Sequence, residues 1–254
     1  FIYSPPGGGK TLSVASSAMA AGVTPLDIRG TASIPGFARK LAYAVYKAQG
    51  KEIVVWVDDC DMLFTDEQSL NVMKGVLDEE VSVLSWNKNI AAQINRDVAS
   101  SDPHTQEIGL AMKSFQEPGS PGVDIPTNNV RFIVTSNKDL CEPGMVGLPG
   151  KAVSKRLMHE AAIRDRVNYH SFSPTRRESW GWIAATLLDP ACNLSGVSGV
   201  FQLSNEQKHE LLHFMHDNWA NLPSTSFRAV KDLAAIMVNY PTTYTTMWEM
   251  GLKS

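Results

Sequence analysis

The chain begins with Phe1-Ile2-Tyr3-Ser4-Pro5-Pro6-Gly7-Gly8-Gly9-Lys10-Thr11. A short apolar run here leads into a glycine turn, and apolar residues at helical spacing follow as far as Gly22. Glycines reach positive φ without strain, so several backbone N–H groups of such a turn can point at one anion. A strand, a glycine loop and a helix N-terminus in this order predict a loop that binds nucleotide phosphates. A merely flexible glycine turn is the alternative.

The two residues after the glycines fit this prediction. Lys10 would neutralise the β- and γ-phosphates of ATP, and the Thr11 hydroxyl would hold Mg²⁺. Ser4 stands where the pattern G-x-x-x-x-G-K-[ST] has its first glycine. We therefore expect ATP and Mg²⁺ as cofactors.

The composition is that of an ordinary globular protein. Hydrophobic residues make up 43% and charged residues 19% of a chain of 254 residues, which suits one large or two modest domains. No apolar run approaches the roughly 20 residues of a membrane helix. We expect a cytoplasmic protein without a membrane partner. Because the sequence starts inside what reads as a core strand, we also expect further residues before Phe1.

Two counts narrow the function classes. The 3 cysteines, at positions 60, 141 and 192, have no paired CxxC spacing, so the sequence predicts neither a disulfide framework nor a zinc site. The net charge of −3 gives no general attraction to nucleic acid.

The next part of the chain predicts alternating helices and strands. Pro35 opens a helix that ends at Gly50, and Ile53–Val57 reads as a strand buried on both faces. Thr65 followed by Gln68 predicts a capping box for a helix after it. Further strands are expected at 81–86, 130–134 and 167–172, and a helix at 152–163. This alternation predicts a parallel doubly wound sheet.

Two carboxylates, Asp58 and Asp59, directly follow the buried strand at 53–57. Ligands of α/β folds bind at the carboxyl ends of parallel strands, so Asp58 is expected to hold Mg²⁺ and Asp59 to orient water. A helix N-cap or a solvated turn is the alternative for both. Asp61 is expected to make local contacts only. Asn137, after the strand at 130–134, either senses the γ-phosphate or is a turn residue.

Between Asn87 and Thr127 the pattern loosens. A helical stretch around Ile90 and Ile94 is followed by a polar bend at 100–104 and a Pro/Gly loop at 117–122. We expect an irregular insertion that is functional or mobile. Lys88, Arg96 and Lys113 either contact a phosphate backbone or are solvated surface, and Trp86 either contacts substrate or is buried.

Beyond Pro174 the pattern is helical alone. Three apolar stripes predict helices around 180–188, 207–219 and 227–237, the second capped by Ser204 with Gln207. The sequence thus predicts an α/β domain, a P-loop parallel sheet between helices, at 1–173 and a small all-helical domain at 174–254.

This order of motifs resembles the AAA+ ATPases over nearly the whole chain, and it is most similar to the clamp-loader members. The resemblance implies a Walker A loop from Pro6 through Gly7, Gly8, Gly9, Lys10 and Thr11 to Leu12. It implies a Walker B pair in Asp58 and Asp59, although the family usually has Asp-Glu, and sensor 1 in Asn137. The C-terminal helices would be the lid.

The resemblance also extends to three arginines. The segment Ala162-Ile163-Arg164-Asp165-Arg166-Val167 is similar to the one that carries the arginine finger, with Arg166 as the finger and Arg164 as the second candidate. A surface salt bridge is the alternative. Ser224-Thr225-Ser226-Phe227-Arg228 resembles the sensor 2 segment that opens a lid helix, which implies that Arg228 contacts the phosphates. An arginine in the first turn of a helix opposes the helix dipole unless an anion lies nearby, so its position favours this role.

The family implies an ATPase that hydrolyses ATP between the subunits of an oligomeric ring, most often a hexamer. Its substrate would be a macromolecule such as DNA or a DNA-bound complex. An ATP-controlled assembly or loading switch of the clamp-loader or helicase-loader type is the alternative, and a P-loop kinase for a small molecule is the third. Asp58-Asp59-Cys60-Asp61-Met62-Leu63-Phe64 also resembles AAA+ proteins of tailed bacteriophages, which act in the host cytoplasm.

Overall fold

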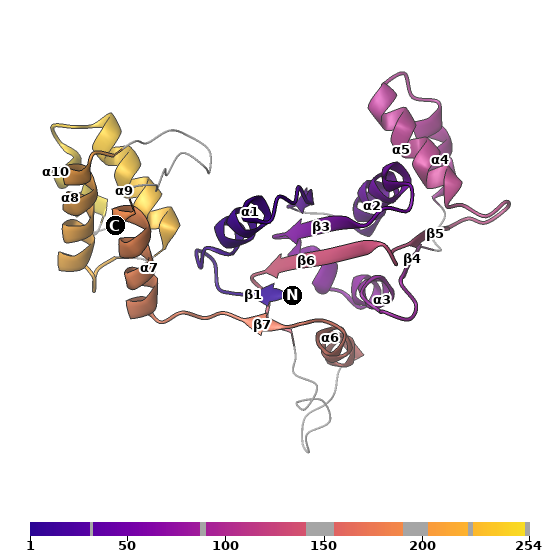
Figure 1. Cartoon of the computed structure of the whole chain (residues 1–254), viewed down its shortest axis with the longest axis horizontal. Helices are drawn as coiled ribbons and strands as arrows, with labels where there is room; N and C mark the ends of the chain where they lie inside the picture. The colour runs from indigo at the N-terminus through magenta and orange to yellow at the C-terminus, as the bar shows by residue number, and fades with distance from the viewer. Residues whose placement is uncertain (31–32, 87–89, 141–154, 190–202, 223–225, 252–254) are drawn as a thin grey trace, which may run out of the picture. The chain divides into compact units, whose positions relative to one another are not determined.

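The computed structural model describes residues 1–30, 33–86, 90–140, 155–189, 203–222 and 226–251. Its centre is a sheet of five strands in the order β2-β3-β6-β1-β7 (Figure 1), and all four neighbouring pairs are parallel. The strands are β1 (Ile2–Tyr3), β2 (Leu26–Arg29), β3 (Ile53–Asp58), β6 (Val130–Ser136) and β7 (His170–Ser171). This confirms the predicted α/β class with a parallel sheet, and the architecture is compatible with a P-loop-like core.

The chain forms two compact units, which we describe separately. One unit comprises Phe1–Ser4 and Ala15–Ser171, and the other comprises Pro5–Val14 and Phe172–Ser254. The helix α1 (Lys10–Ala20) begins in the second unit and ends in the first.

The register of the sheet brings the carboxyl ends of its strands level. Asp58 of β3 lies opposite Arg29 of β2 and opposite Thr135 of β6. Tyr3 of β1 lies opposite Ser136, the last residue of β6. Polar residues at and just after these strand ends therefore gather at one edge of the sheet.

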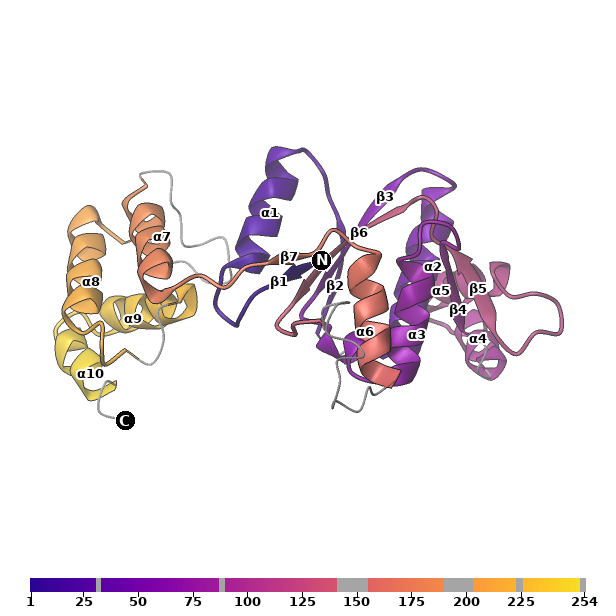
Figure 2. The ribbon, with the colours of Figure 1, turned by 90° about the horizontal axis from the view of Figure 1, so that it is seen from below.

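Helices cover both faces of this sheet. α2 (Ile34–Ala48) lies on one face, and α3 (Glu67–Val76) and α6 (Lys155–Asp165) lie on the other, which Figure 2 shows from below. The Ser33 hydroxyl caps α2 by accepting the Gly36 N–H at 3.3 Å. Burial of apolar side chains such as Phe37 and Leu41, both fully inaccessible to solvent, holds α2 on the strands.

The start of α3 corrects the prediction of a Thr65 cap. The Asp66 carboxylate accepts the Ser69 N–H at 2.9 Å and the Ser69 hydroxyl at 2.6 Å. The hydroxyl bond, followed by the N–H bond, lowers the pKa of Asp66 below its usual range. Thr65 instead donates to the Met62 carbonyl at 2.9 Å, at the end of the 3-10 helix η1 (Asp61–Phe64). Aspartate and threonine are both good caps, so the pattern alone was one residue out.

The stretch predicted to be an irregular insertion is largely ordered, so the expectation of irregular structure was wrong. Its helical part near Ile90 and Ile94 is α4 (Ala91–Val98), as predicted, whereas α5 (Pro103–Ser114) and β5 (Val123–Pro126) were not predicted. β4 (Val83–Trp86) precedes this stretch and lies within the strand predicted at 81–86. β4 and β5 pair antiparallel in a sheet of their own, outside the parallel sheet. The predicted bend at 100–104 is a helix start, because the Asp102 carboxylate accepts the Thr105 N–H at 2.8 Å and Pro103 opens α5. Trp86 is buried, which was one of the two alternatives given for it, the other being contact with substrate.

The hairpin of α4 and α5 is fastened to α2. The Arg39 guanidinium lies 2.8 Å from the buried Asp97 carboxylate of α4. On the surface, Glu107 of α5 accepts from the Tyr43 hydroxyl at 2.9 Å and from Lys47 Nζ at 3.1 Å. The hairpin, which projects from the sheet in Figure 1, therefore has two polar attachments to α2.

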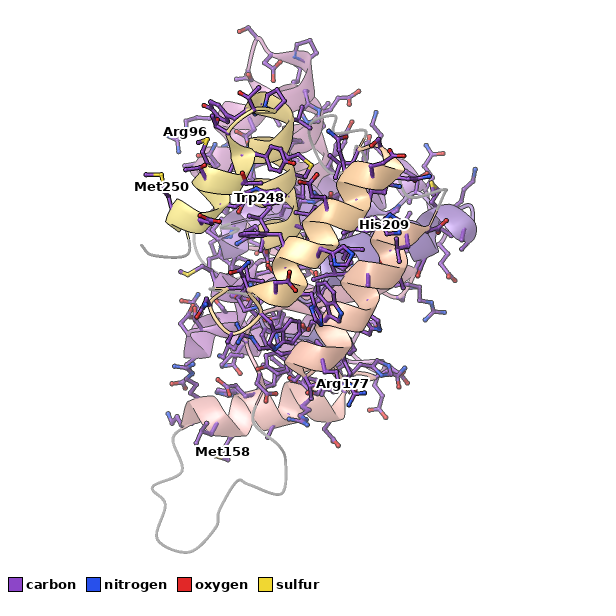
Figure 3. All side chains as sticks on the ribbon, turned by 90° about the vertical axis from the view of Figure 1, so that its left-hand side faces the viewer. Arg96, Met158, Arg177, His209, Trp248 and Met250 are labelled. Atoms are coloured by element: carbon purple, nitrogen blue, oxygen red, sulfur yellow. The ribbon has the colours of Figure 1, made fainter. Side chains whose placement is uncertain are left out.

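Among its described residues the C-terminal part contains helices joined by turns and no strand. Its helices are α7 (Arg176–Leu188), α8 (Asn205–Asp217), α9 (Phe227–Asn239) and α10 (Tyr244–Gly251), and the first three match the predicted stripes. Ser204 and Gln207 form the predicted capping box. The helix α10 was not predicted. Its Trp248, labelled in Figure 3, is fully packed among these helices and donates its indole N–H to the Leu233 carbonyl at 2.9 Å.

Some predicted features lie outside the described residues. They are Lys88, Cys141, Cys192 and the first part of the helix predicted at 152–163. Over the described ranges, no helix combines the length and the apolar character needed to cross a membrane.

Gly109 tests the packing of the hairpin. A Cβ there would lie 2.5 Å from the Val98 backbone nitrogen, so Gly109→Ala must push α5 away from α4. We expect a loss of about 1–3 kcal/mol in the free energy of unfolding, measured by urea titration. Gly181→Ala is the matched control, because a Cβ on Gly181 in α7 meets open space and should add about 0.5–1 kcal/mol. Equal stability of the Gly109→Ala and wild-type proteins would contradict this packing.

Candidate functional site

The glycine loop adopts the conformation that its sequence predicts. Gly7 and Gly9 have φ of 83° and 79°, a region that side-chain-bearing residues rarely occupy. The Gly8 N–H donates to the Pro5 carbonyl at 3.3 Å, and the helical bonding of α1 starts with the Ser13 N–H on the Gly9 carbonyl at 2.9 Å. The loop thus turns directly into the N-terminus of α1, whose first N–H groups point along the helix axis.

The side chains around this turn are arranged for an anion. Lys10 is buried, and its ammonium lies 3.4 Å from the Pro5 carbonyl. Thr11 is half-buried in the first turn of α1. Pro6 is exposed at the tip of the loop, and Leu12 continues the helix.

The loop packs against the N-terminus of a second helix, α9, within the same unit. A Cβ on Gly7 would lie 2.6 Å from the Ser226 Cβ, and one on Gly9 would lie 3.9 Å from the Phe227 ring. Ser226 is buried and caps α9 by accepting the Ala229 N–H at 3.3 Å. Arg228 is exposed in the first turn of α9. The N-termini of α1 and α9, which are the positive ends of the helix dipoles, thus belong to one region with Lys10 and Arg228. This concentration of positive charge favours a bound anion.

The other unit carries the predicted acidic residues at the carboxyl ends of its strands. The Asp58 carboxylate is buried and accepts the Thr135 hydroxyl at 2.5 Å. Thr135 in turn accepts the Trp56 indole N–H at 3.1 Å. Asp58 Oδ2 lies 3.8 Å from Arg29 Nε. The N-cap of η1 is Cys60, so neither Asp58 nor Asp59 is a helix cap. Asp59 is exposed in a bend, so a solvated turn stays the alternative for that residue.

Asp59 has an uncommon backbone conformation. Its φ is 53°, in the left-handed region, which costs a residue other than glycine about 1 kcal/mol or more. Its N–H donates to the Thr135 carbonyl at 3.2 Å, and its carboxylate accepts the Asn137 side-chain amide at 2.9 Å. The structure therefore brings Asp59 and Asn137 together, as the sequence suggested for neighbouring strand ends.

Asp61 corrects the expectation of local contacts. Its Oδ1 accepts the Ser136 hydroxyl at 2.6 Å and the Asn137 backbone N–H at 3.3 Å. It therefore joins η1 to the end of β6, 75 residues further along the chain. Arg29 and Thr135 are further polar neighbours of Asp58 that we did not predict. Only the strand register, which aligns Asp58 with both of them, would have indicated them.

The two candidate finger arginines each have hydrogen-bond partners within their own unit. Arg166 Nε donates to the Asp78 carboxylate at 2.8 Å, and its Nη1 donates to the Ala162 carbonyl at 2.7 Å. The Arg166 hydrogen bond is the main reason that the pKa of Asp78 lies below its usual range. Arg166 follows α6 and precedes β7, so it lies toward the amino ends of the parallel strands, opposite the edge with Asp58.

Arg164 is more firmly enclosed than Arg166. Its Nη1 donates to the Leu140 carbonyl at 2.7 Å, and its guanidinium lies 4.0 Å from the centre of the Tyr169 ring. Tyr169 donates to Asp139, and burial, with that bond, raises the pKa of its hydroxyl well above the usual range. Of the two arginines, Arg166 has the more accessible side chain, 36% exposed against 19%.

The residues present fit Mg²⁺ and a nucleotide in their chemistry. Hydroxyl and carboxylate oxygens, which Thr11 and Asp58 provide, are the ligands that Mg²⁺ prefers. Backbone N–H groups at a helix N-terminus and an ammonium are the usual partners of phosphate. In the described ranges no group of three or more histidine, cysteine, aspartate and glutamate side chains is arranged to hold a metal ion by itself.

Gly7 and Gly9 provide a matched pair for testing the loop. Gly7→Ala should both strain the backbone and clash with Ser226, whereas Gly9→Ala should only strain the backbone. We expect the free energy of unfolding to fall by about 1–2 kcal/mol for Gly9→Ala and by more for Gly7→Ala. Calorimetric scans of both variants measure this difference. A Gly7→Ala protein no less stable than the Gly9→Ala protein would contradict the contact with α9.

Comparison with known proteins adds no family to this description. No protein-family model matches the chain, and no curated protein sequence matches it. The functional argument therefore depends on the residues and geometry given above.

Proposed function

We propose that this protein is an AAA+ ATPase that binds and hydrolyses ATP between the subunits of a ring, a hexamer in the family it resembles. The observation that carries the proposal is the glycine loop, with two glycines at positive φ before the N-terminus of α1. These two glycines turn the chain directly into a helix N-terminus, whose free N–H groups are suited to bind phosphate.

The residues of the loop would bind the nucleotide. The segment from Pro6 to Leu12 would surround the phosphates, Lys10 would neutralise their charge, and Arg228 would contact them from α9. Thr11 and Asp58 would hold Mg²⁺, which shields phosphate charge when it is bound.

Asp59 and Asn137 would position the attacking water. Asp59 is the exposed member of the acid pair, and its carboxylate is oriented by the Asn137 amide at 2.9 Å. Water activation needs a carboxylate that is both reachable and oriented, and Asp59 meets both conditions. An aspartate side chain is one methylene shorter than the glutamate usual in the family, which favours slow turnover.

One specific observation favours a second candidate function, an assembly or loading switch that is controlled by ATP. Asp59 stands where the family usually has glutamate, and its side chain is one methylene shorter, so its carboxylate would reach the attacking water less well and hydrolyse ATP slowly. A slow ATPase suits an assembly or loading factor of the clamp-loader or helicase-loader type better than a fast motor. DNA or a DNA-bound complex as the substrate, and a bacteriophage protein acting in the host cytoplasm, follow from the resemblance alone.

Arg166 would act on a neighbouring subunit. It lies toward the amino ends of the strands, whereas the Asp58 and Asp59 of its own chain lie at the carboxyl ends. A guanidinium supplied by a neighbour can stabilise charge in the transition state of phosphoryl transfer. Arg164, enclosed by Leu140 and Tyr169, is the weaker candidate.

Lys10 tests nucleotide binding. Lys10→Ala removes the buried ammonium, and we expect binding of a fluorescent ATP analogue to weaken by about 10- to 100-fold, or to be lost. Lys40→Ala, an exposed position on α2, is the matched control and should bind like the wild type. Unchanged affinity of a folded Lys10→Ala protein would rule out the loop as the phosphate site.

A mixture of two inactive variants tests the ring. Arg166→Ala should bind ATP normally but lose about 10³-fold in turnover, and Asp59→Ala should also bind without turnover. In a mixture, the Asp59 of one subunit meets the Arg166 of the other, so ATPase activity should return. Arg131→Ala removes another exposed cation near the amino ends of the strands and should stay active alone. Mixtures that assemble, bind ATP and stay inactive at every ratio would exclude a site shared between subunits.

A further inference from the structure

Four consecutive side chains, from Thr135 near the end of β6 to Lys138 just after it, are bonded to the short segment from Asp58 to Phe64. Thr135 donates to Asp58, Ser136 to Asp61, Asn137 to Asp59 and Lys138 to the Phe64 carbonyl. The partners all lie between positions 58 and 64. The two segments are therefore joined by one network of hydrogen bonds, although more than 70 residues separate them in the chain.

Asn137 is the only one of the four that would contact the reacting water, and it lies just beyond the last residue of its strand. Its backbone is therefore not held by the strand ladder in the way that Thr135 is. The Asp61 carboxylate holds the Asn137 backbone instead, because its Oδ1 accepts the Asn137 N–H at 3.3 Å. The same oxygen accepts the buried Ser136 hydroxyl at 2.6 Å, and the Ser136 oxygen accepts the Lys138 N–H at 2.9 Å. The turn from 136 to 138 is thus fixed on both sides of Asn137.

We infer that Asp61 is a positioning residue that sets the Asn137 amide in the geometry needed to orient Asp59 and water. This inference rests on the proposed ATP hydrolysis. Asp61 acts through Asn137 and does not touch the reacting atoms. Asp61 needs to provide only one acceptor oxygen at a fixed position, since the Ser136 hydroxyl and the Asn137 N–H both donate to the same atom, Oδ1. The charge of Asp61 is not required for it.

This reasoning separates two substitutions at the same position. Asp61→Asn keeps an oxygen where Oδ1 lies and can accept both bonds, whereas Asp61→Ala removes the acceptor. A displacement of about 1 Å in a catalytic group can lower a rate by about 100-fold. We expect Asp61→Ala to lower kcat by about 10- to 100-fold with KM for ATP within about twofold of wild type. Asp61→Asn should keep kcat within about threefold of wild type.

Two further variants complete the kinetic test. Ser136→Ala removes one of the two bonds and should lower kcat by less than Asp61→Ala does. It also keeps the inference testable if Asp61→Ala fails to fold. Asp124→Ala, an exposed carboxylate on β5, is the control for loss of one negative charge and should match wild type. Equal kcat in the wild-type, Asp61→Ala and Ser136→Ala proteins would overturn the inference, as would equal losses in Asp61→Asn and Asp61→Ala.

A second readout does not depend on turnover. The Asn137 side-chain amide gives an NMR signal that is assigned by its disappearance in Asn137→Ala. Asp61→Ala should shift this signal toward that of a solvated asparagine, while Asp61→Asn leaves it in place. An unmoved signal in Asp61→Ala would overturn the positioning role even if kcat fell. A wild-type protein without ATPase activity would refute the proposed function, and the NMR comparison would still decide whether Asp61 positions Asn137.

Discussion

The parallel pairing of β3 with β6 is the constraint on which the acidic edge depends. Six consecutive residue pairs, from Ile53 with Val130 to Asp58 with Thr135, fix where each strand ends relative to the other. Because side chains alternate between the two faces of a strand, a slip of one residue would move Thr135 away from Asp58. The bonds from Ser136 and Asn137 to η1 would be lost with it. The apolar ladder in the core thus sets the polar geometry at its end.

The glycine loop depends on a different constraint, the backbone conformation at Gly7 and Gly9. Positive φ at Gly7 and Gly9 lets the chain reverse into α1, and the lack of a side chain at Gly7 lets it approach Ser226. The same atoms therefore allow the turn and its packing on α9. Two helix N-termini meet the loop within this unit, and with Lys10 they make the region electropositive. Such a region is more stable with an anion than without one.

Sequence reasoning succeeded where one local signal determined the outcome. Apolar runs located β3 and β6, and consecutive glycines located the loop. It failed where competing signals were close in energy, as for the cap of α3, and where polar helices such as α5 are stabilised by packing. The contacts of Asp61 could not be read from the sequence, because they require the register of strands separated by more than 70 residues. Asp59 directly follows β3, as predicted, but its left-handed backbone could not be predicted, because it occurs together with the same long-range bonds.

Strand direction places different charged groups at the two edges of the sheet. In a parallel sheet all carboxyl ends lie at one edge, so Asp58, Asp59 and Asn137 gather there and Arg166, which precedes β7, cannot join them. In this chain the Arg166 charge is balanced by Asp78 at the other edge. An exposed ion pair of this kind contributes little stability, so its partner can be exchanged at small cost. In the proposed ring, a phosphate presented by another subunit would compete with Asp78 for Arg166, and this exchange would link assembly to the proposed ATP hydrolysis.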